Sequence, residues 1–366
     1  MRSAVLFNIF NRPELTAQSF AAIRAARPPR LYVAADGPRE ARPDDAKKCR
    51  LTRETALAVD WPCEVKTLLR KRNLGCKVAC ISAITWFFRQ ESEGIVLEDD
   101  CVPHADFFPY CDELLERYRH NRKIMLISGS NFQYGKRRGP ASYYFSIFAH
   151  IWGWAAWADT WNMYNPHPEG MEKFAASKLP VLLRHPAAAR LLTKKLLLIR
   201  LGLDDISWDY QLWYAIMNNN GLCAIPNANL VRNIGCVPDS THVNDPRLTT
   251  MRPVEAMPRM EHPKAVLRDF EADQFACECF AAEESGLDAV LLREALKRLQ
   301  EGDLEDNKRL LDTAMTFFGP REDFLSLKKA NDTLLAAPRQ KQRLVLRFED
   351  SQAVTEDHTA GLAEVI

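Results

Sequence analysis

The most informative stretch of the sequence is Gly94-Ile95-Val96-Leu97-Glu98-Asp99-Asp100, in which a short apolar run leads directly into three acids. Such a run predicts a buried central strand over residues 94–97, so the acids lie at the carboxyl end of that strand. Three adjacent carboxylates repel one another unless a cation lies among them. We therefore expect a charged site at one edge of a buried sheet.

The three acids need not point the same way. Side chains alternate along a strand, so Glu98 and Asp100 share one face and Asp99 the other if the strand geometry continues. One face then serves a ligand and its metal ion together. The plainer alternative is an acidic turn that stabilises a following helix near Asp106, because acids collect at helix starts.

Short apolar runs and helical periodicity alternate on both sides of this stretch, up to about Ser130. This alternation is typical of an α/β layer architecture with a mostly parallel sheet flanked by helices. The predicted strands are residues 4–10, 31–35, 65–69, 123–127 and 144–148. The predicted helices include residues 12–26, where Pro13 lies in the first turn, and residues 77–90.

The composition excludes several classes of protein. The 366 residues include 49 basic and 48 acidic side chains, whereas a general nucleic-acid binder would be basic. The first residues lack the apolar stretch and cleavage site of a secretory signal, and no run approaches 18 apolar residues. The ten cysteines are too dilute for a disulfide scaffold and are not spaced as zinc ligands. We expect a soluble, cytoplasmic protein with reduced cysteines.

The chain divides into three parts by pattern. Residues 1–262 form the expected sheet domain, with a helical insert at about 171–202. Residues 263–348 read as a C-terminal helical module, with Leu-rich segments near 287–299, 304–318 and 323–335, and residues 349–366 as a polar tail. The apolar stripes of this module need a surface to cover, and a homodimer through these helices is one assembly that covers them.

From Gly94 to Pro103, followed by Asp106-Phe107-Phe108, the sequence resembles the metal-binding segment of GT-A-fold glycosyltransferases. It is most similar to those related to N-acetylglucosaminyltransferase I and to bacterial nucleotide-diphospho-sugar transferases. The resemblance extends from Val5 to about Asn244 and implies a GT-A, Rossmann-like fold. It also implies a divalent cation, Mn²⁺ or Mg²⁺, on Asp100, with the nucleotide sugar beside Glu98 and Asp99.

The resemblance assigns two further groups to the nucleotide. Asn11 and Arg12, after the first strand, and Asp36, after the second, stand where the family contacts the nucleotide, and ligands in open α/β sheets gather at such strand ends. For Asp36 a turn-forming Asp-Gly is an equal alternative. Arg72 and Lys77 precede or begin a helix and offer a positive edge to a diphosphate, although a solvated basic turn explains either one.

The remaining assignments lie later in the chain. His242 matches the histidine that completes the metal shell in the family, although a lone histidine is usually structural. Asp209 matches the general base of inverting members, with a first-turn acid that stabilises its own helix as the alternative. The tryptophans of an aromatic-rich segment offer faces for the acceptor sugar, but such residues are as often core. They are Trp152, Trp154 and Trp208.

These residues favour a metal-dependent glycosyltransferase that moves a sugar from a nucleoside-diphosphate sugar to a glycan, lipid-linked or protein acceptor. Asp209 would act as base in an inverting reaction, although the sequence leaves retaining chemistry open. A sugar-phosphate nucleotidyltransferase would need a glycine-rich loop after the first strand, and Asn11-Arg12-Pro13-Glu14 is not one. A non-catalytic scaffold with a transferase-like fold is the third alternative.

Overall fold

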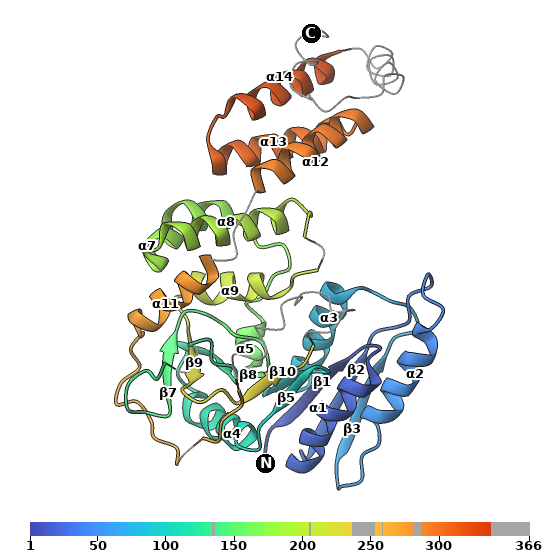
Figure 1. The fold of residues 1–366 in the computed structure, drawn as a ribbon, viewed down its shortest axis with the longest axis vertical. Helices are drawn as coiled ribbons and strands as arrows, with labels where there is room; N and C mark the ends of the chain where they lie inside the picture. Colours follow the sequence, from blue (N-terminus) through green and yellow to red (C-terminus); the bar gives the residue numbers. More distant parts are fainter. Residues whose placement is uncertain (134–135, 205, 236–252, 258, 282–286, 338–366) are drawn as a thin grey trace. The chain divides into compact units, whose positions relative to one another are not determined.

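The computed structural model describes residues 1–133, 136–204, 206–235, 253–257, 259–281 and 287–337 (Figure 1). The chain divides into two compact units. The sheet unit comprises Met1–Ala189 and Asp204–Ala281, and the helical unit comprises Arg190–Leu203 and Ala282–Ile366. The expected boundary at 262 differs from this division, because residues 263–281 pack with the sheet.

Within the described residues, the sheet unit contains one eight-stranded mixed sheet. Its strands are β1 (Ala4–Ile9), β2 (Arg30–Ala35), β3 (Glu64–Leu69), β4 (Glu93–Glu98), β6 (Ile124–Ser128), β7 (Tyr143–Ser146), β8 (Trp154–Trp157) and β9 (Leu222–Pro226). They lie in the order β3-β2-β1-β4-β8-β6-β9-β7, and only β8 and β7 run antiparallel to their neighbours. This confirms the predicted α/β class with a mostly parallel sheet.

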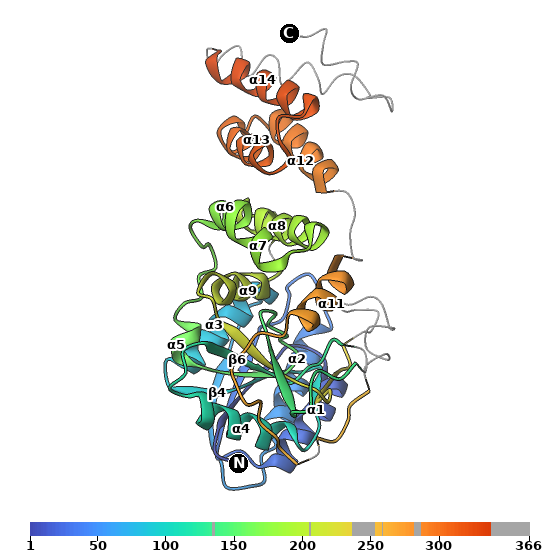
Figure 2. The ribbon, with the colours of Figure 1, turned by 90° about the vertical axis from the view of Figure 1, so that its left-hand side faces the viewer.

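Helices cover both faces of the sheet (Figure 2). They are α1 (Pro13–Ala26), α2 (Asp45–Ala56), α3 (Cys76–Phe88), α4 (Phe107–Tyr118), α5 (Ala158–Trp161), α9 (Asp209–Asn218) and α11 (Phe270–Ala281). On one face, α1 and α4 pack against Phe7 and Leu97. On the other, α3 and α9 pack against Leu6 and Val96. Successive side chains of one strand therefore belong to opposite cores, as the period of a strand requires.

A second, two-stranded sheet follows the acids directly. It pairs β5 (Cys101–Pro103) with β10 (Val231–Asn233) in antiparallel register, so that Asn233 lies opposite Cys101. A further main-chain hydrogen bond extends this strand pair, because the Ile234 amide donates to the Asp100 carbonyl at 2.8 Å. The backbone on either side of Asp100 is thereby fixed by hydrogen bonds to a distant segment.

Strand β8 corrects the interpretation of the aromatic segment. Trp154 pairs with strands on both sides of β8, and its side chain is 1% exposed among Phe88, Trp161 and Trp208. Trp208 is 3% exposed in the same core. A ring covered by neighbouring side chains has no free face for a sugar, so these two tryptophans pack the core, as the plainer alternative holds.

The predicted helical insert consists of α6 (Met171–Lys173), η1 (Phe174–Lys178), α7 (Leu179–Leu183) and α8 (Pro186–Arg200). Helix α11 is bound to β7 through a buried carboxylate. Asp273 accepts from the Ser146 hydroxyl and from Arg268 Nε, each at 2.5 Å. Arg268 also donates to the Leu182 carbonyl at 2.8 Å. These bonds hold residues 268–281 within the sheet unit.

The helical unit contains α12 (Leu287–Glu301), α13 (Leu304–Phe318) and α14 (Glu322–Ala336), close to the three predicted segments. Its core includes Leu311, Phe324 and Leu327. The Asn307 amide donates to the Asn331 side-chain oxygen at 3.1 Å, and Asn331 donates to the Leu304 carbonyl at 2.9 Å, which joins α13 to α14. No helix in the described part of the chain is long and apolar enough to cross a membrane.

Candidate functional site

The acids after β4 meet the loop after β1. The two strands are parallel neighbours, with Asn8 opposite Glu98, so their carboxyl ends share one edge of the sheet. Arg12 caps α1 there, and its Nη2 forms ion pairs with Asp99 Oδ1 and, at 3.1 Å, with Asp100 Oδ2. The Phe10 amide donates to Asp99 Oδ2 at 3.1 Å. One guanidinium therefore bridges two of the three predicted acids.

Asp100 has a second set of neighbours on the far segment. Asn233 Nδ2 donates to Asp100 Oδ1 at 3.3 Å, and the Gly235 amide donates to Asn233 Oδ1 at 2.8 Å. A Cβ added to Gly235 would overlap with Asp100 Oδ2. Glycine at this position thus lets the backbone lie directly against the oxygen that Arg12 also contacts. The sequence analysis missed Asn233 and Gly235, and their only signal was a glycine close behind a short strand.

The electrostatics of the cluster favour an added cation. Burial, and then the negative charge of Asp100, raise the pKa of Glu98 well above its usual range. Burial raises the pKa of Asp99 to about 6, although Arg12 favours its ionised form. For Arg12, burial lowers the pKa but the two aspartates raise it by more, so the guanidinium stays charged. The raised pKa values show that the one charge of Arg12 does not fully compensate the repulsion among the two buried aspartates and the half-buried Glu98.

Asp36 binds the loop that follows β3. Its carboxylate accepts from the Gly37 amide at 2.8 Å, the Leu74 amide at 3.0 Å and Asn73 Nδ2 at 2.9 Å. Gly37 lies against the backbone of Arg72 so closely that a Cβ would overlap with it. Asp36 therefore holds together the loops after β2 and β3, in keeping with the Asp-Gly turn named as an alternative above.

A second carboxylate, which the sequence analysis did not single out, organises the loop between β2 and α2. Asp45 accepts from Asn11 Nδ2 at 2.8 Å and from Arg39 Nε at 2.6 Å. The Arg39 guanidinium lies 5.3 Å from the centre of the Phe10 ring. The Arg39 hydrogen bond lowers the pKa of Asp45 to about 2. The hydrogen bond to Asp45 thereby positions Asn11, which precedes Arg12 in the chain.

The two predicted cationic residues near Gly75 differ in their surroundings. Arg72 is exposed, whereas Lys77 is buried and its Nζ donates to the Asp204 carbonyl at 2.8 Å. The Asp204 carboxylate in turn accepts from the amides of Ile206 and Ser207. Lys77 is thus joined to the segment that leads into α9.

Asp209 is the first residue of α9 and is half-buried. Burial, and then the charge of Asp209, raise the pKa of Tyr164, whose hydroxyl donates to the Trp208 carbonyl at 3.0 Å. Trp152 is half-buried and its ring centre lies 5.2 Å from that of Phe132. Of the three predicted acceptor tryptophans, Trp152 is the one that keeps partial exposure.

The cation-binding prediction rests on few described ligands. His242 lies outside the described residues, and within those residues no group of three or more His, Cys, Asp or Glu side chains is arranged to hold a metal ion. Asp100 nevertheless fits the expected chemistry, because Mg²⁺ and similar hard cations bind through one or two carboxylates together with substrate phosphates. In this structure Asp100 Oδ2 is paired with Arg12 and lies against Gly235, so a cation would have to take the place of Arg12.

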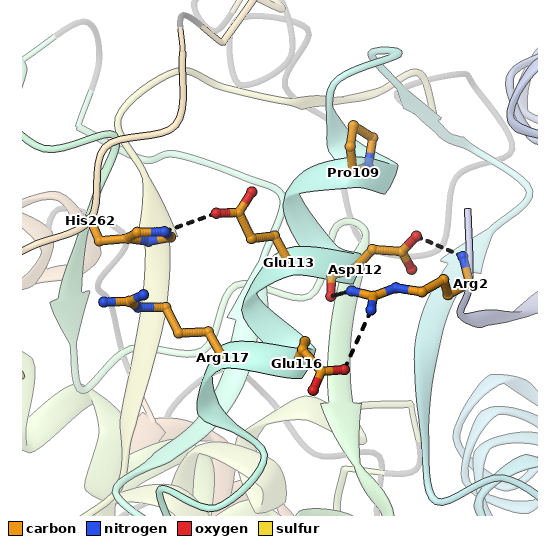
Figure 3. A pocket seen from close by; sticks show the side chains of 7 residues that line it. All are labelled: Arg2, Pro109, Asp112, Glu113, Glu116, Arg117 and His262. Atoms are coloured by element: carbon orange, nitrogen blue, oxygen red, sulfur yellow. Dashed lines mark hydrogen bonds and ion pairs between the residues drawn. The ribbon is translucent and has the colours of Figure 1, made fainter.

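A separate charged pocket of about 410 Å³ lies beside the amino-terminal start of β1, at the opposite end of the sheet from Asp100 (Figure 3). Its acids already have partners. Asp112 accepts from the Arg2 amide at 2.7 Å, and Glu113 pairs with His262 Nε2 at 2.8 Å (Figure 3). His262 Nδ1 is also 3.0 Å from the Tyr143 hydroxyl. The pocket therefore resembles a surface ion-pair network more than a second site.

No family model and no curated protein matches this chain. Two solved structures show a limited likeness. HddC from Yersinia pseudotuberculosis is 10% identical with a TM-score of 0.27, over 44% of this chain and 80% of that one. UTP-bound UGPase from Acinetobacter baumannii is 7% identical with a TM-score of 0.31, over 62% of this chain and 86% of that one. Similarity at these scores identifies neither a family nor an activity.

Proposed function

We propose that the protein is a metal-dependent glycosyltransferase that moves a sugar from a nucleoside-diphosphate sugar to an acceptor hydroxyl. The observation that carries the proposal is the acid triplet at the carboxyl end of β4, whose two buried aspartates are bridged by Arg12. Excess negative charge at this edge of an α/β sheet suits a cation that accompanies an anionic ligand. The resemblance of residues 94–103 to GT-A enzymes supports the same reading.

The donor binds, in this proposal, across the ends of β1, β2 and β4. Glu98 faces the nucleotide, and Arg72 and Lys77 supply positive charge to the diphosphate. Asp99 acts by holding Arg12, because both of its oxygens are already bound. Asn11 is held in place by Asp45. Asp36 acts by positioning the loop that carries Asn73, because its oxygens are already bound to that loop.

Asp100, together with His242, would hold the divalent cation. When bound, the cation would neutralise the charge that develops on the departing diphosphate. Arg12 would share this task at the same edge of the sheet, since its charge is kept by two carboxylates. Both contributions are electrostatic and need no movement of protons at this end of the site.

Asp209 serves as the base. It is the first residue of α9, which starts after Trp208 and is far in sequence from the acid triplet. Its carboxylate takes the proton of the acceptor hydroxyl while the hydroxyl oxygen bonds to the anomeric carbon and the diphosphate departs. A base on the face opposite the leaving group gives inversion at that carbon.

Donor binding and base catalysis can be tested separately. Nucleoside-diphosphate sugars with Mn²⁺ should raise the unfolding midpoint of the full chain. Asp209→Asn should keep that shift and lower sugar transfer by about 10²- to 10⁴-fold. The matched control is Asp159→Asn, which removes a first-turn acid from α5 without affecting transfer. Retained anomeric configuration in the product, or full transfer by Asp209→Asn, would contradict this role.

The same assay addresses the alternative. A nucleotidyltransferase would form a nucleotide sugar and pyrophosphate from a sugar 1-phosphate and a nucleoside triphosphate. We expect no such product, because the loop after β1 begins Asn11-Arg12-Pro13 and lacks the glycines that wrap a triphosphate. The acceptor class and dimerisation through the C-terminal helices stay predictions.

A further inference from the structure

We propose that Arg12 is the resident counter-ion of the acid triplet, and that Arg12 and a divalent cation bind Asp100 Oδ2 as alternatives. The inference rests on the metal-dependent function proposed above. It goes beyond that function by assigning to this chain its own occupant of the cation position in the absence of donor. It also predicts that metal and anionic donor help each other to bind.

The two aspartates hold Arg12 unequally. The Asp99 side chain is 3% exposed, and a main-chain amide, that of Phe10, fixes its second oxygen at 3.1 Å. The Asp100 side chain is 13% exposed, and its other partners, Asn233 Nδ2 and the Cys101 thiol, lie at the longer distances of 3.3 and 3.6 Å. Asp99 is therefore the anchor of the guanidinium, and Asp100 is the contact that exchanges more readily.

The position of Arg12 calls for exchange rather than addition. A cation on Asp100 Oδ2 would lie beside Arg12 Nη2, which is 3.1 Å from the same oxygen. Two positive charges at this separation repel strongly where water is largely excluded. Binding of the cation thus requires Arg12 to leave Asp100.

Arg12 can leave Asp100 without leaving the site. Its side chain is 26% exposed, and the ion pair with Asp99 does not depend on Asp100. The donors released from Asp100 remain at the edge where β1 and β4 end, so they become available to an anion. A cation that displaces Arg12 therefore prepares a phosphate contact, and an anion that draws Arg12 away prepares the cation position. By thermodynamic linkage, the cation and the anion then raise the affinity for each other by the same factor.

The test measures Mn²⁺ binding to the full chain without nucleotide, by the loss of the electron paramagnetic resonance signal of the free ion. Arg12→Met removes the charge and keeps much of the side-chain length. We expect it to bind Mn²⁺ about tenfold more tightly than the wild type. The matched control is Arg39→Met, which removes a guanidinium of the same edge that is paired with Asp45 instead. It should leave Mn²⁺ affinity unchanged.

Equal or weaker Mn²⁺ affinity in folded Arg12→Met would overturn the inference, as would an equal gain in Arg39→Met. If Arg12→Met does not fold, the Mn²⁺ affinity of Arg12→Lys tests the inference instead. Its single ammonium cannot bridge both acids at once, so Mn²⁺ affinity should lie above that of the wild type. Unchanged affinity in Arg12→Lys would then overturn the inference.

A second measurement tests the coupling. Adding inorganic pyrophosphate should tighten Mn²⁺ binding by the wild-type protein more than by Arg12→Met, after correction for the Mn²⁺ that pyrophosphate itself binds. Equal tightening in both proteins would contradict a role for Arg12. The proposed function fails by a different result, namely that no nucleoside-diphosphate sugar raises the unfolding midpoint of the wild type, with or without Mn²⁺.

Discussion

Beyond the ends of β1, β2 and β4, carboxylates hold the loops of the sheet unit in place, whereas around β8 aromatic rings pack against one another. In the first region Asp36, Asp45 and Asp99 each accept bonds from main-chain amides or from arginine. In the second region Trp154 and Trp208 have ring centres 6.2 Å apart in a dry core. In these two regions, buried charge lies at the strand ends beside the candidate site, while the buried rings serve stability. Elsewhere in the sheet unit a buried carboxylate also serves stability, since Asp273 joins α11 to β7.

Among the substitutions that test this comparison, one at Trp154 should have the largest effect on the free energy of unfolding. Trp154→Ala should lower the free energy of unfolding by about 3–5 kcal/mol, because it empties a site that is 1% exposed. Trp154→Phe should cost much less, since it keeps a ring and removes an indole N–H that has no hydrogen-bond partner in the described residues. Urea unfolding measures both. Stable Trp154→Phe protein with strongly reduced sugar transfer would show that the aromatic region carries function after all.

Asp36 tests the charged region. Asp36→Ala removes the acceptor of the Gly37 and Leu74 amides, which should cost about 2 kcal/mol of stability. We expect weaker binding of nucleoside-diphosphate sugar as well, because the loop with Asn73 loses its attachment. Asp60→Ala is the control, since Asp60 pairs with Arg24 on an exposed surface and should change little. Normal stability of Asp36→Ala would contradict a holding role.

The smallest effect is a pH dependence of stability at Asp45. Its folded-state pKa is about 2, below the unfolded value of about 3.9. The ionised form therefore stabilises the fold above pH ~4, and this contribution is lost as the pH falls toward ~2. Because Arg39 is half-exposed, we expect about 1 kcal/mol. The stability difference between wild type and Asp45→Asn, measured in urea from pH 5 to pH 2, should shrink steadily, although about half of the folded protein still has Asp45 ionised at pH 2. A stability difference that does not change with pH would show that the ionisation of Asp45 does not stabilise the fold.

The strands and helices that the sequence predicts well are those with local signals. Strand β1 is an apolar run interrupted only by Asn8, and α1 has Pro13 in its first turn. Helix α2 was not predicted, because it is polar and buries few residues, such as Cys49 and Ala56. Strand β8 was not predicted either, since a four-residue strand is defined by its partners β4 and β6 rather than by its own pattern.

The candidate site divides in the same way. The acid triplet was visible as a departure from ordinary composition at a strand end. The bridge from Arg12 to Asp99 and Asp100 was not visible, because it joins segments that meet only in the folded sheet. Asn233 was missed for the same reason, since its bond to Asp100 depends on the pairing of β5 with β10. Tertiary contacts of this kind have no local signature.

Gly235 leaves no room for a side chain opposite Asp100, and natural selection on that acid therefore acts on two distant positions at once. A descendant chain that gained alanine at 235 would have to displace the carboxylate, so glycine and acid should be inherited together. The same holds for Asn233, whose amide bonds the acid and whose oxygen bonds the glycine. We therefore expect relatives that keep Glu-Asp-Asp at 98–100 to keep Asn-x-Gly at 233–235 as well. Relatives that keep the acids but vary freely at 233 and 235 would contradict this expectation.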